Sequence, residues 1–175
     1  MPELLVMVNG LPGSGKSTLG RALARELGAR FLSKDAVKEA LAASVDGAGA
    51  LSALGGIAMD TVWALAPAMS NDVVIDSWWF APRDRASARS GLAAAGAARA
   101  VEIWCDVPAE IARVRYESRD RPGLYRDREH LVRDWDAWAA QAEPLGLAAA
   151  TISVDTSGPV DCALLAERVR SSVCY

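Results

Sequence analysis

The fold is decided by residues 4–17, which read LLVMVNGLPGSGKS. Within them, residues 4–8 form a continuous apolar run of β-formers, which is typical of a strand buried on both faces of a sheet. Residues 11–15 then form a turn, and from Lys16 onward the chain places leucines at positions 19, 23 and 27. This spacing predicts an amphipathic helix of about three turns that ends at Gly28. A buried strand, a glycine-rich turn and a helix therefore open the chain.

The same alternation of strands and helices continues along the sequence. Short apolar runs predict four more strands, at residues 31–33, 73–76, 101–105 and 151–155. Helices are expected at residues 35–42, about 57–69, 82–95, 108–118, 131–142 and 160–173. Parallel strands need crossover connections, and these helices supply them. We therefore predict an α/β fold with three layers, α/β/α, around a five-stranded parallel sheet, as one domain over residues 1–175.

Composition excludes several classes of protein. The 175 residues are 51% hydrophobic and 23% charged, which is too apolar for a disordered chain. The net charge of -3 gives no basic field, so neither nucleic acid nor a membrane is an expected partner. The sequence shows neither a basic leader nor an apolar run long enough to span a membrane, which favours a cytoplasmic protein. Its three cysteines, at positions 105, 162 and 174, lack CxxC spacing and indicate buried thiols.

Residues 10–17 match the pattern G-x-x-x-x-G-K-S between the expected strand and the expected helix. In such a loop the glycines let consecutive N–H groups point inward, and the following helix adds its positive amino end. Lys16 is expected to reach the terminal phosphates of a nucleotide, and Ser17 to offer its hydroxyl to Mg²⁺. The alternative is a plain glycine-rich turn, but such a turn has no use for Lys16 and Ser17 at these offsets.

This motif is the P-loop, or Walker A motif, and in so short a chain it resembles the small P-loop kinases, such as shikimate, gluconate and nucleoside monophosphate kinases. The resemblance covers nearly the whole chain. It implies the P-loop NTPase fold with strand order 2-3-1-4-5, a closing lid, and ATP as the phosphoryl donor. It also implies that the loop residues that bind ATP are Gly10, Gly13, Ser14, Gly15, Lys16, Ser17 and Thr18.

A carboxylate near the second expected strand is a candidate for acid–base chemistry. In the kinases that the chain resembles, a carboxylate at this point takes or orients the proton of the acceptor hydroxyl, and the matching residue is Asp35. Asp35 also precedes a helical pattern, so a helix N-cap is the alternative interpretation. Shikimate kinases carry Asp-x-Asp here, whereas this chain has Ser33 in place of the first aspartate. This departure disfavours shikimate as the substrate.

A second carboxylate, Asp76, closes the apolar run 73–75 in the manner of a Walker B strand. It is expected to hold Mg²⁺ beside Ser17. A solvated carboxylate at the end of a strand is one alternative, and contact with the acceptor, as in some relatives, is another.

Residues 77–80, Ser-Trp-Trp-Phe, follow where a parallel strand is expected to open into the cleft. Three adjacent rings cannot all face the core, so at least one is expected to line the acceptor pocket, where it suits a sugar face or an aromatic ring. Trp78 and Trp79 are therefore candidate substrate-binding residues, and Arg83 is a third from the next helix. The alternatives are tryptophans packed in the core and an exposed arginine at a helix start.

The segment of about residues 116–128 is rich in arginine and is expected to form the lid. Arg115 and Arg119 lie four residues apart on one helix face, where like charges repel unless an anion joins them. We expect both to bind the nucleotide, and Arg119 and Arg121 to neutralise charge during phosphoryl transfer. A solvated face balanced by nearby carboxylates is the alternative. The run 115–123 resembles the lid of the chloramphenicol phosphotransferase-like kinases, which does not identify the substrate.

These features favour a kinase that uses ATP and Mg²⁺ to phosphorylate a hydroxyl of a small molecule, such as a metabolite, a sugar or an antibiotic. Its expected catalytic residues are Asp35, Lys16, Arg119 and Arg121, whereas the single histidine, His130, is expected to be a surface or structural residue. One alternative is a polynucleotide or nucleotide-sugar kinase of the polynucleotide kinase or zeta-toxin type. Another is a regulatory module that binds nucleotide without phosphoryl transfer. Either a monomer or a homodimer is compatible with the sequence.

Overall fold

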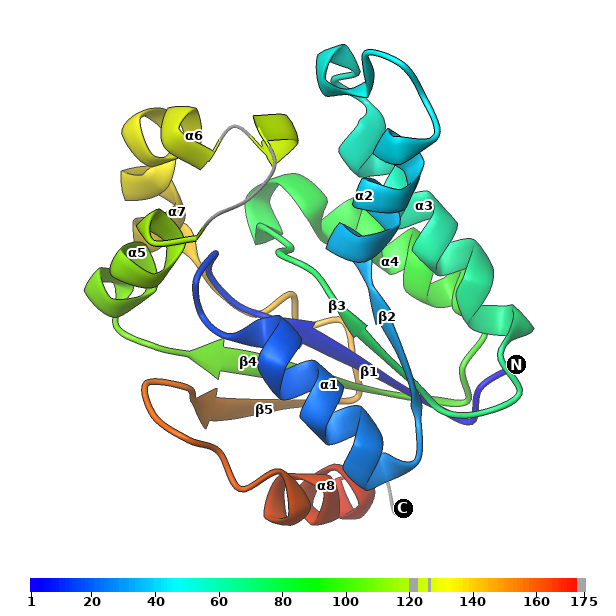
Figure 1. The fold of residues 1–175 in the computed structure, drawn as a ribbon. Helices are drawn as coiled ribbons and strands as arrows, with labels where there is room; N and C mark the ends of the chain where they lie inside the picture. Colours follow the sequence, from blue (N-terminus) through cyan, green and yellow to red (C-terminus); the bar gives the residue numbers. More distant parts are fainter. Residues whose placement is uncertain (120–122, 126, 173–175) are drawn as a thin grey trace.

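The computed structural model of the chain describes residues 1–119, 123–125 and 127–172, without the side chain of residue 124. Its centre is a five-stranded sheet in which neighbouring strands are parallel, in the order β2-β3-β1-β4-β5 (Figure 1). This arrangement confirms the predicted fold class and the strand order that the resemblance implied. The strands are β1 (Leu4–Asn9), β2 (Arg30–Ser33), β3 (Val73–Asp76), β4 (Arg99–Asp106) and β5 (Ala150–Asp155).

Helices cover both faces of the sheet, and the central strand β1 supplies side chains to both (Figure 1). The even-numbered apolar side chains of β1 join the core beneath α1 (Lys16–Leu27) and α8 (Cys162–Ser171). The odd-numbered ones join the core beneath α3 (Leu54–Leu65) and α4 (Ala81–Ala95). A strand buried on both sides needs apolar residues at every position, which is why β1 reads as a continuous apolar run.

Beyond the carboxyl ends of the strands lie the elements that surround the phosphate loop. In Figure 1, α5, α6 and α7 lie together on one side of this loop, and α2 lies on the other. Apolar and aromatic side chains of α5 and α7 pack with Leu11 of the loop in a third cluster. None of the described helices is both long and apolar enough to cross a lipid bilayer. The bounds are α2 (Lys34–Ala43), α5 (Ala109–Glu117), η3 (Gly123–Tyr125), α6 (Asp127–Arg133) and α7 (Trp135–Gln141).

One predicted helix lies earlier in the chain than its apolar pattern indicated. The helix expected over residues 57–69 spans Leu54–Leu65 and gives way to the 3-10 turn η2 (Ala66–Ala68). Pro67 lies inside that turn, where its ring and missing N–H are incompatible with a continuing α-helix. The preceding glycine- and alanine-rich stretch contains a second short 3-10 turn, η1 (Ala48–Ala50).

The single helix predicted over residues 131–142 is wrong, because this stretch contains two short helices, α6 and α7, that meet at Asp134. Both Trp135 and Trp138 are nevertheless buried in the third cluster. The apolar stripe therefore continues across the junction, and periodicity alone does not reveal the break.

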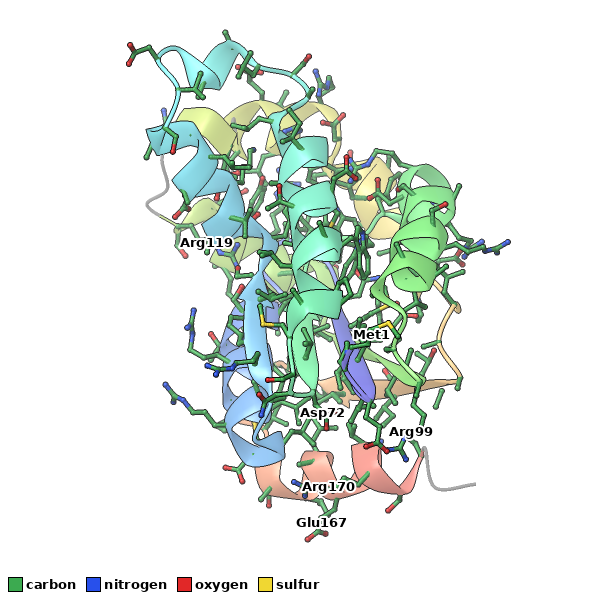
Figure 2. The ribbon with its side chains drawn as sticks, turned by 90° about the vertical axis from the view of Figure 1, so that its right-hand side faces the viewer. Met1, Asp72, Arg99, Arg119, Glu167 and Arg170 are labelled. Carbon is green, nitrogen blue, oxygen red and sulfur yellow. The ribbon has the colours of Figure 1, made fainter. Side chains whose placement is uncertain are left out.

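The amino edge of the sheet is held by polar contacts. The Leu4 N–H donates to Asp72 Oδ1 at 2.9 Å, and the Arg99 guanidinium pairs with Glu3 at 2.6 Å. Figure 2 shows Asp72 and Arg99 toward one end of the molecule and Arg119 toward the other. The phosphate loop and the helices α5, α6 and α7 thus lie at the opposite edge, where the strands end.

The packing of α4 on α3 depends on the missing side chain of Gly91. A Cβ atom at this position would lie 2.3 Å from the Trp63 ring, which is itself 5% exposed. We therefore expect Gly91→Ala to lower the free energy of unfolding by about 1–3 kcal/mol. Urea denaturation measures the loss. The matched control is Gly56→Ala on the exposed face of α3, where no atom lies within 4 Å, and a gain of about 0.5–1 kcal/mol is expected. Equal responses from the two variants would contradict this packing.

Candidate functional site

The phosphate loop, residues 10–17, joins β1 to α1 in a conformation that requires glycine. Gly13 and Gly15 have φ values of 87° and 86°, in the left-handed region that favours glycine. A Cβ atom on Gly13 would also lie 2.0 Å from the carbonyl oxygen of Ala112 in α5. The loop thus passes directly against α5, and the first N–H groups of α1 have no acceptors within their own helix. Such N–H groups are a ready site for an anion.

Lys16 folds back over this loop. Its ammonium group donates to the carbonyl oxygens of Gly10 and Leu11, both at 2.8 Å, and the residue is 8% exposed. Burial lowers the pKa of Lys16 from 10.5 to about 8, and the charge of Arg119 lowers it further, while Cys105 and Asp76 act in the opposite direction. Carbonyl oxygens are weaker partners for an ammonium than phosphate oxygens. The environment of Lys16 therefore favours an added anion.

Ser17 and Asp76 meet where β3 ends. The Ser17 hydroxyl donates to Asp76 Oδ2, whereas the buried Oδ1 has no hydrogen-bond partner among the described residues. Burial raises the pKa of Asp76, against the opposing effects of Ser17, Ser33 and Lys16. A hydroxyl, a carboxylate and one unsatisfied oxygen are a donor set that fits Mg²⁺, which usually binds one or two protein ligands and keeps waters. No cluster of three metal-ligating side chains occurs within the described ranges.

Asp35 lies in the first turn of α2, and the capping interpretation of this residue is wrong. The N-cap is Ser33, whose hydroxyl accepts the Ala36 N–H at 3.5 Å, so the Asp35 carboxylate is not the cap. Its side chain is 40% exposed and lies 3.8 Å from the Lys34 ammonium. Asp35 thus keeps a half-buried carboxylate at the mouth of the site.

A cavity of 180 Å³ brings most of the predicted site together. It lies between the phosphate loop, the start of α2, the end of β3 and the helices α5, α6 and α7. Loop, metal and acceptor candidates therefore share one space. The predicted residues that line it are Lys16, Ser17, Asp35, Asp76, Trp78, Arg83 and Arg119.

The two tryptophans that follow β3 have different environments. Trp78 lines this cavity and a larger one of 620 Å³ beside it, and its ring packs against Phe80 and Trp138. Trp79 is 2% exposed and stacks on Trp63 with ring centroids 6.0 Å apart, and of these two cavities it borders the larger one. Trp78 is thus a wall of the site, and Trp79 is mainly a core residue.

Arg83 also borders both of these cavities. Its guanidinium makes two hydrogen bonds of 2.7 Å to the carboxylate of Asp84. This pairing raises the pKa of Arg83 and fixes the direction of its side chain. A ligand that binds to Arg83 must therefore share it with Asp84.

A third cavity, of 460 Å³, lies on the other side of the loop and is bordered by Gly13, Gly15 and Thr18. Arg115 borders it and donates to the carbonyl oxygens of Thr156 and Ser157, at 2.8 and 2.7 Å. The segment after β5 therefore forms a wall of this cavity. Ser14, also predicted to bind nucleotide, is fully buried, and its hydroxyl has no hydrogen-bond partner within the described part of the chain.

The lid arginines are thus separated. Arg115 is tied to the segment after β5, whereas Arg119 borders both the 180 Å³ and the 460 Å³ cavity. Arg119 is therefore placed where the two spaces meet. The predicted role of Arg121 falls on a residue outside the described ranges.

The described cysteines carry free thiols, as expected. Cys105 is buried, and burial raises its pKa to about 12. Cys162 is half-buried at the wall of the 460 Å³ cavity, and burial raises its pKa as well. Neither thiol is therefore activated as a nucleophile.

Comparison with known proteins places this geometry in a family. A family profile described as an AAA domain (AAA_33) matches residues 5–145. The chain belongs to this family. A shikimate kinase of Paracidovorax citrulli (strain AAC00-1) is 58% identical over 38 residues, which is 22% of this chain and only about a fifth (21%) of that protein.

Solved structures of other proteins have the same fold as this chain. A kinase candidate from Chloroflexus aurantiacus j-10-fl superimposes with a TM-score of 0.75 at 21% identity over 98% of both chains. The APS kinase of Mycobacterium tuberculosis, in complex with AMPPNP and APS, gives a TM-score of 0.64 at 22% identity, over 97% of this chain and 96% of that one. The expected likeness to small P-loop kinases is thus confirmed at the level of the fold.

Several residues that line the 180 Å³ cavity were not predicted from the sequence, among them Lys38, Tyr125 and His130. Tyr125 donates its hydroxyl to the Glu39 carboxylate at 2.8 Å and to the Asp35 carbonyl at 3.2 Å, and the Lys38 ammonium lies 4.5 Å from its ring centroid. His130, expected to be a surface or structural residue, contacts Asp134 at 2.7 Å and lines both the 180 Å³ and the 620 Å³ cavity. A tyrosine and a lysine far apart in sequence carry no shared pattern, so only the fold reveals this grouping.

The buried ammonium of Lys16 predicts a pH dependence of stability. The unfolded chain holds the Lys16 proton up to about pH 10.5 and the folded chain only up to about 8, so between these values the unfolded state binds more protons. The free energy of unfolding should therefore contain a contribution that rises with pH in this window, by at most about 1.4 kcal/mol per pH unit. Urea denaturation of nucleotide-free protein at several pH values measures it.

Lys16→Met removes the titrating group and should remove this contribution, whereas Lys34→Met, a change to a lysine at the same cavity, should retain it. An identical pH dependence in the wild type and in Lys16→Met would show that Lys16 is not desolvated.

Proposed function

We propose that this protein is a kinase that uses ATP and Mg²⁺ to phosphorylate a hydroxyl group of a small molecule. The observation that carries the proposal is the 180 Å³ cavity, in which Lys16 of the phosphate loop, the Ser17–Asp76 pair and the Asp35 carboxylate face one another. Phosphoryl transfer needs charge stabilisation and positioning, and these groups supply both. The structural neighbours include kinases of small molecules, which agrees with this reaction class.

The phosphate loop and its surroundings account for nucleotide binding. The N–H groups at the start of α1 would hold phosphate oxygens, and Lys16 would exchange its two carbonyl partners for the terminal phosphates. Arg119 borders both the 180 Å³ cavity and the 460 Å³ cavity, and would contact the nucleotide where the two meet. The 460 Å³ cavity is large enough for a base and a ribose, and the segment after β5 forms its wall.

Ser17 and Asp76 would hold Mg²⁺, with the unsatisfied Oδ1 of Asp76 bonded to one of its waters. When bound, the metal supplies positive charge that offsets the charge of the phosphate groups.

Asp35 would receive the proton of the acceptor hydroxyl. As the acceptor oxygen bonds to the γ-phosphorus, the bond from that phosphorus to the bridging oxygen breaks, and the hydroxyl proton passes to the carboxylate. Trp78 would support one face of the acceptor, because its ring lines both cavities on this side. Arg83, shared with Asp84, would orient a polar group of the acceptor.

Transfer from γ-labelled ATP to a panel of hydroxylated metabolites, sugars and antibiotics tests the proposal directly. The expected result is one labelled product that requires Mg²⁺ and is absent with Lys16→Ala. ATP binding without a labelled product across the panel would instead favour a regulatory nucleotide-binding module. Labelling of polynucleotide ends alone would favour a polynucleotide kinase.

Asp35→Asn removes the proposed base and keeps the size of the side chain. We expect turnover to fall by about 10²–10⁴-fold, the range for a general base, whereas the affinity for AMPPNP should change little. Steady-state kinetics and fluorescence titration with a labelled nucleotide separate the two effects. Asp46→Asn, an exposed aspartate in the turn after α2, is the control and should leave both values unchanged. A parallel loss of turnover and nucleotide affinity would contradict a role as base.

Ser17→Ala removes the hydroxyl proposed to bind Mg²⁺. ATP affinity measured by calorimetry with and without Mg²⁺ should show that the metal-dependent increment, and not the metal-free affinity, is reduced. The matched control is Ser90→Ala on the exposed face of α4, where the hydroxyl bonds only within its own helix. An undiminished increment in Ser17→Ala would place the metal elsewhere.

A further inference from the structure

A fully buried carboxylate, Glu102, lies in the central part of the sheet on β4. It accepts three N–H groups: Oε1 accepts the Asn9 side-chain amide at 3.1 Å and the Leu145 N–H at 2.8 Å, and Oε2 accepts the Gly146 N–H at 3.0 Å. No ion pair with Glu102 occurs among the described residues. Both oxygens of Glu102 already act as acceptors, so the side-chain amide of Asn9 must present its donor end to them.

This requirement orients Asn9, which is also fully buried, at the end of β1. A side-chain amide has a donor end and an acceptor end, and Glu102 takes the donor end. The acceptor end therefore points the other way, where Asn9 Oδ1 accepts the Gly10 N–H at 2.8 Å and the Trp79 N–H at 3.1 Å. One oxygen atom thus holds the N–H of the next residue, Gly10, and an N–H 70 residues further along the chain than Asn9.

These two segments belong to the two halves of the proposed site. Gly10 begins the phosphate loop, and Trp79 lies in residues 77–80, called here the acceptor loop, next to the cavity wall formed by Trp78. The pairing of β1 with β3 ends at Val8 and Asp76, followed by a backbone bond from the Ser77 N–H to the Val8 carbonyl at 3.3 Å. Beyond this point the Asn9 side chain provides a connection that the sheet ladder no longer supplies.

We propose that Asn9, oriented by Glu102, is a positioning residue that couples the phosphate loop to the acceptor loop, so that nucleotide binding orders residues 77–80. The inference rests on the proposed function for the identity of the two ligands. A displacement of Gly10 moves the shared oxygen and hence the Trp79 N–H. Coupling of this kind is reciprocal, so an acceptor bound against Trp78 strengthens the binding of the nucleotide.

Amide hydrogen exchange measured by NMR reports directly on the two hydrogen bonds to Asn9 Oδ1, through the exchange rates of the Gly10 and Trp79 N–H groups. In the nucleotide-free protein, Asn9→Ala should speed exchange at both by about five- to tenfold, the equivalent of one lost hydrogen bond. With Mg²⁺ and AMPPNP, exchange at Trp79 should slow in the wild type. In Asn9→Ala, the exchange rate at Trp79 should not change on addition of Mg²⁺ and AMPPNP, even at a nucleotide concentration that saturates this variant. The AMPPNP Kd of Asn9→Ala should rise by about tenfold.

Two variants of Glu102 separate positioning from stability. Glu102→Gln keeps an acceptor oxygen for Asn9 and Leu145 and gives up only the bond from the N–H of Gly146, which is an exposed residue. It should keep the wild-type AMPPNP Kd and the response of Trp79. Glu102→Leu leaves Asn9 without its partner and should behave like Asn9→Ala. Val74→Ala, a change in the opposite core, is the control that lowers stability without touching this unit.

A wild-type response of Trp79 in Asn9→Ala would overturn the proposal, as would its loss in Val74→Ala to the same extent. Glu102→Gln keeps the shape of the wild-type side chain, and its loss of the Trp79 response would overturn the role assigned to the order of donor and acceptor. None of these readouts requires phosphoryl transfer. A protein that binds AMPPNP but phosphorylates no acceptor would therefore refute the proposed function and still test this coupling.

Discussion

The structure depends on how closely the phosphate loop approaches α5. The Gly13 backbone passes so near the Ala112 carbonyl that a Cβ atom would lie 2.0 Å from it, and φ at Gly13 is 87°. Only glycine satisfies both the distance and the dihedral angle. This contact fixes the direction in which the loop leaves β1, and with it the placement of Lys16 and of the first turn of α1. The 180 Å³ cavity, the Ser17–Asp76 pair and the wall made by α5, α6 and α7 all follow from that direction.

Much of the fold could be predicted because each strand is short, apolar and followed by a helical pattern. β1 and β3 are buried on both faces, so their sequences are continuously apolar and leave little room for another interpretation. The order of the strands could not be predicted in this way, because periodicity identifies the elements but not which strands are neighbours. The order came from the resemblance to small P-loop kinases. The junction of α6 and α7 was missed because the apolar stripe runs through Asp134 without a change of period.

The candidate site was predictable where function and local pattern coincide, and not elsewhere. The loop motif located Lys16 and Ser17, and the ends of the strands located Asp35 and Asp76. All four line one cavity. Asp35 and Ser33 both suit a helix start, and the sequence could not tell which one caps α2. Arg115 contacts a segment 41 residues away, and Tyr125 contacts a helix about 90 residues earlier. Because these contacts depend on the fold, no local sequence pattern predicts them.

The separation of Arg115 from Arg119 bears on how the molecule meets a polyanion. The chain carries a net charge of -3, yet Lys16, Arg115 and Arg119 gather around two adjoining cavities. At physiological ionic strength the Debye length is about 8 Å, so mobile ions screen the acidic remainder of the surface from a nucleotide that is still in bulk solvent. A polyanion inside the cavities would lie closer to the three cations than a Debye length, so screening by mobile ions is much weaker there. The net charge of the protein therefore has little effect on a distant polyanion, which is attracted only once it is close to the cavities.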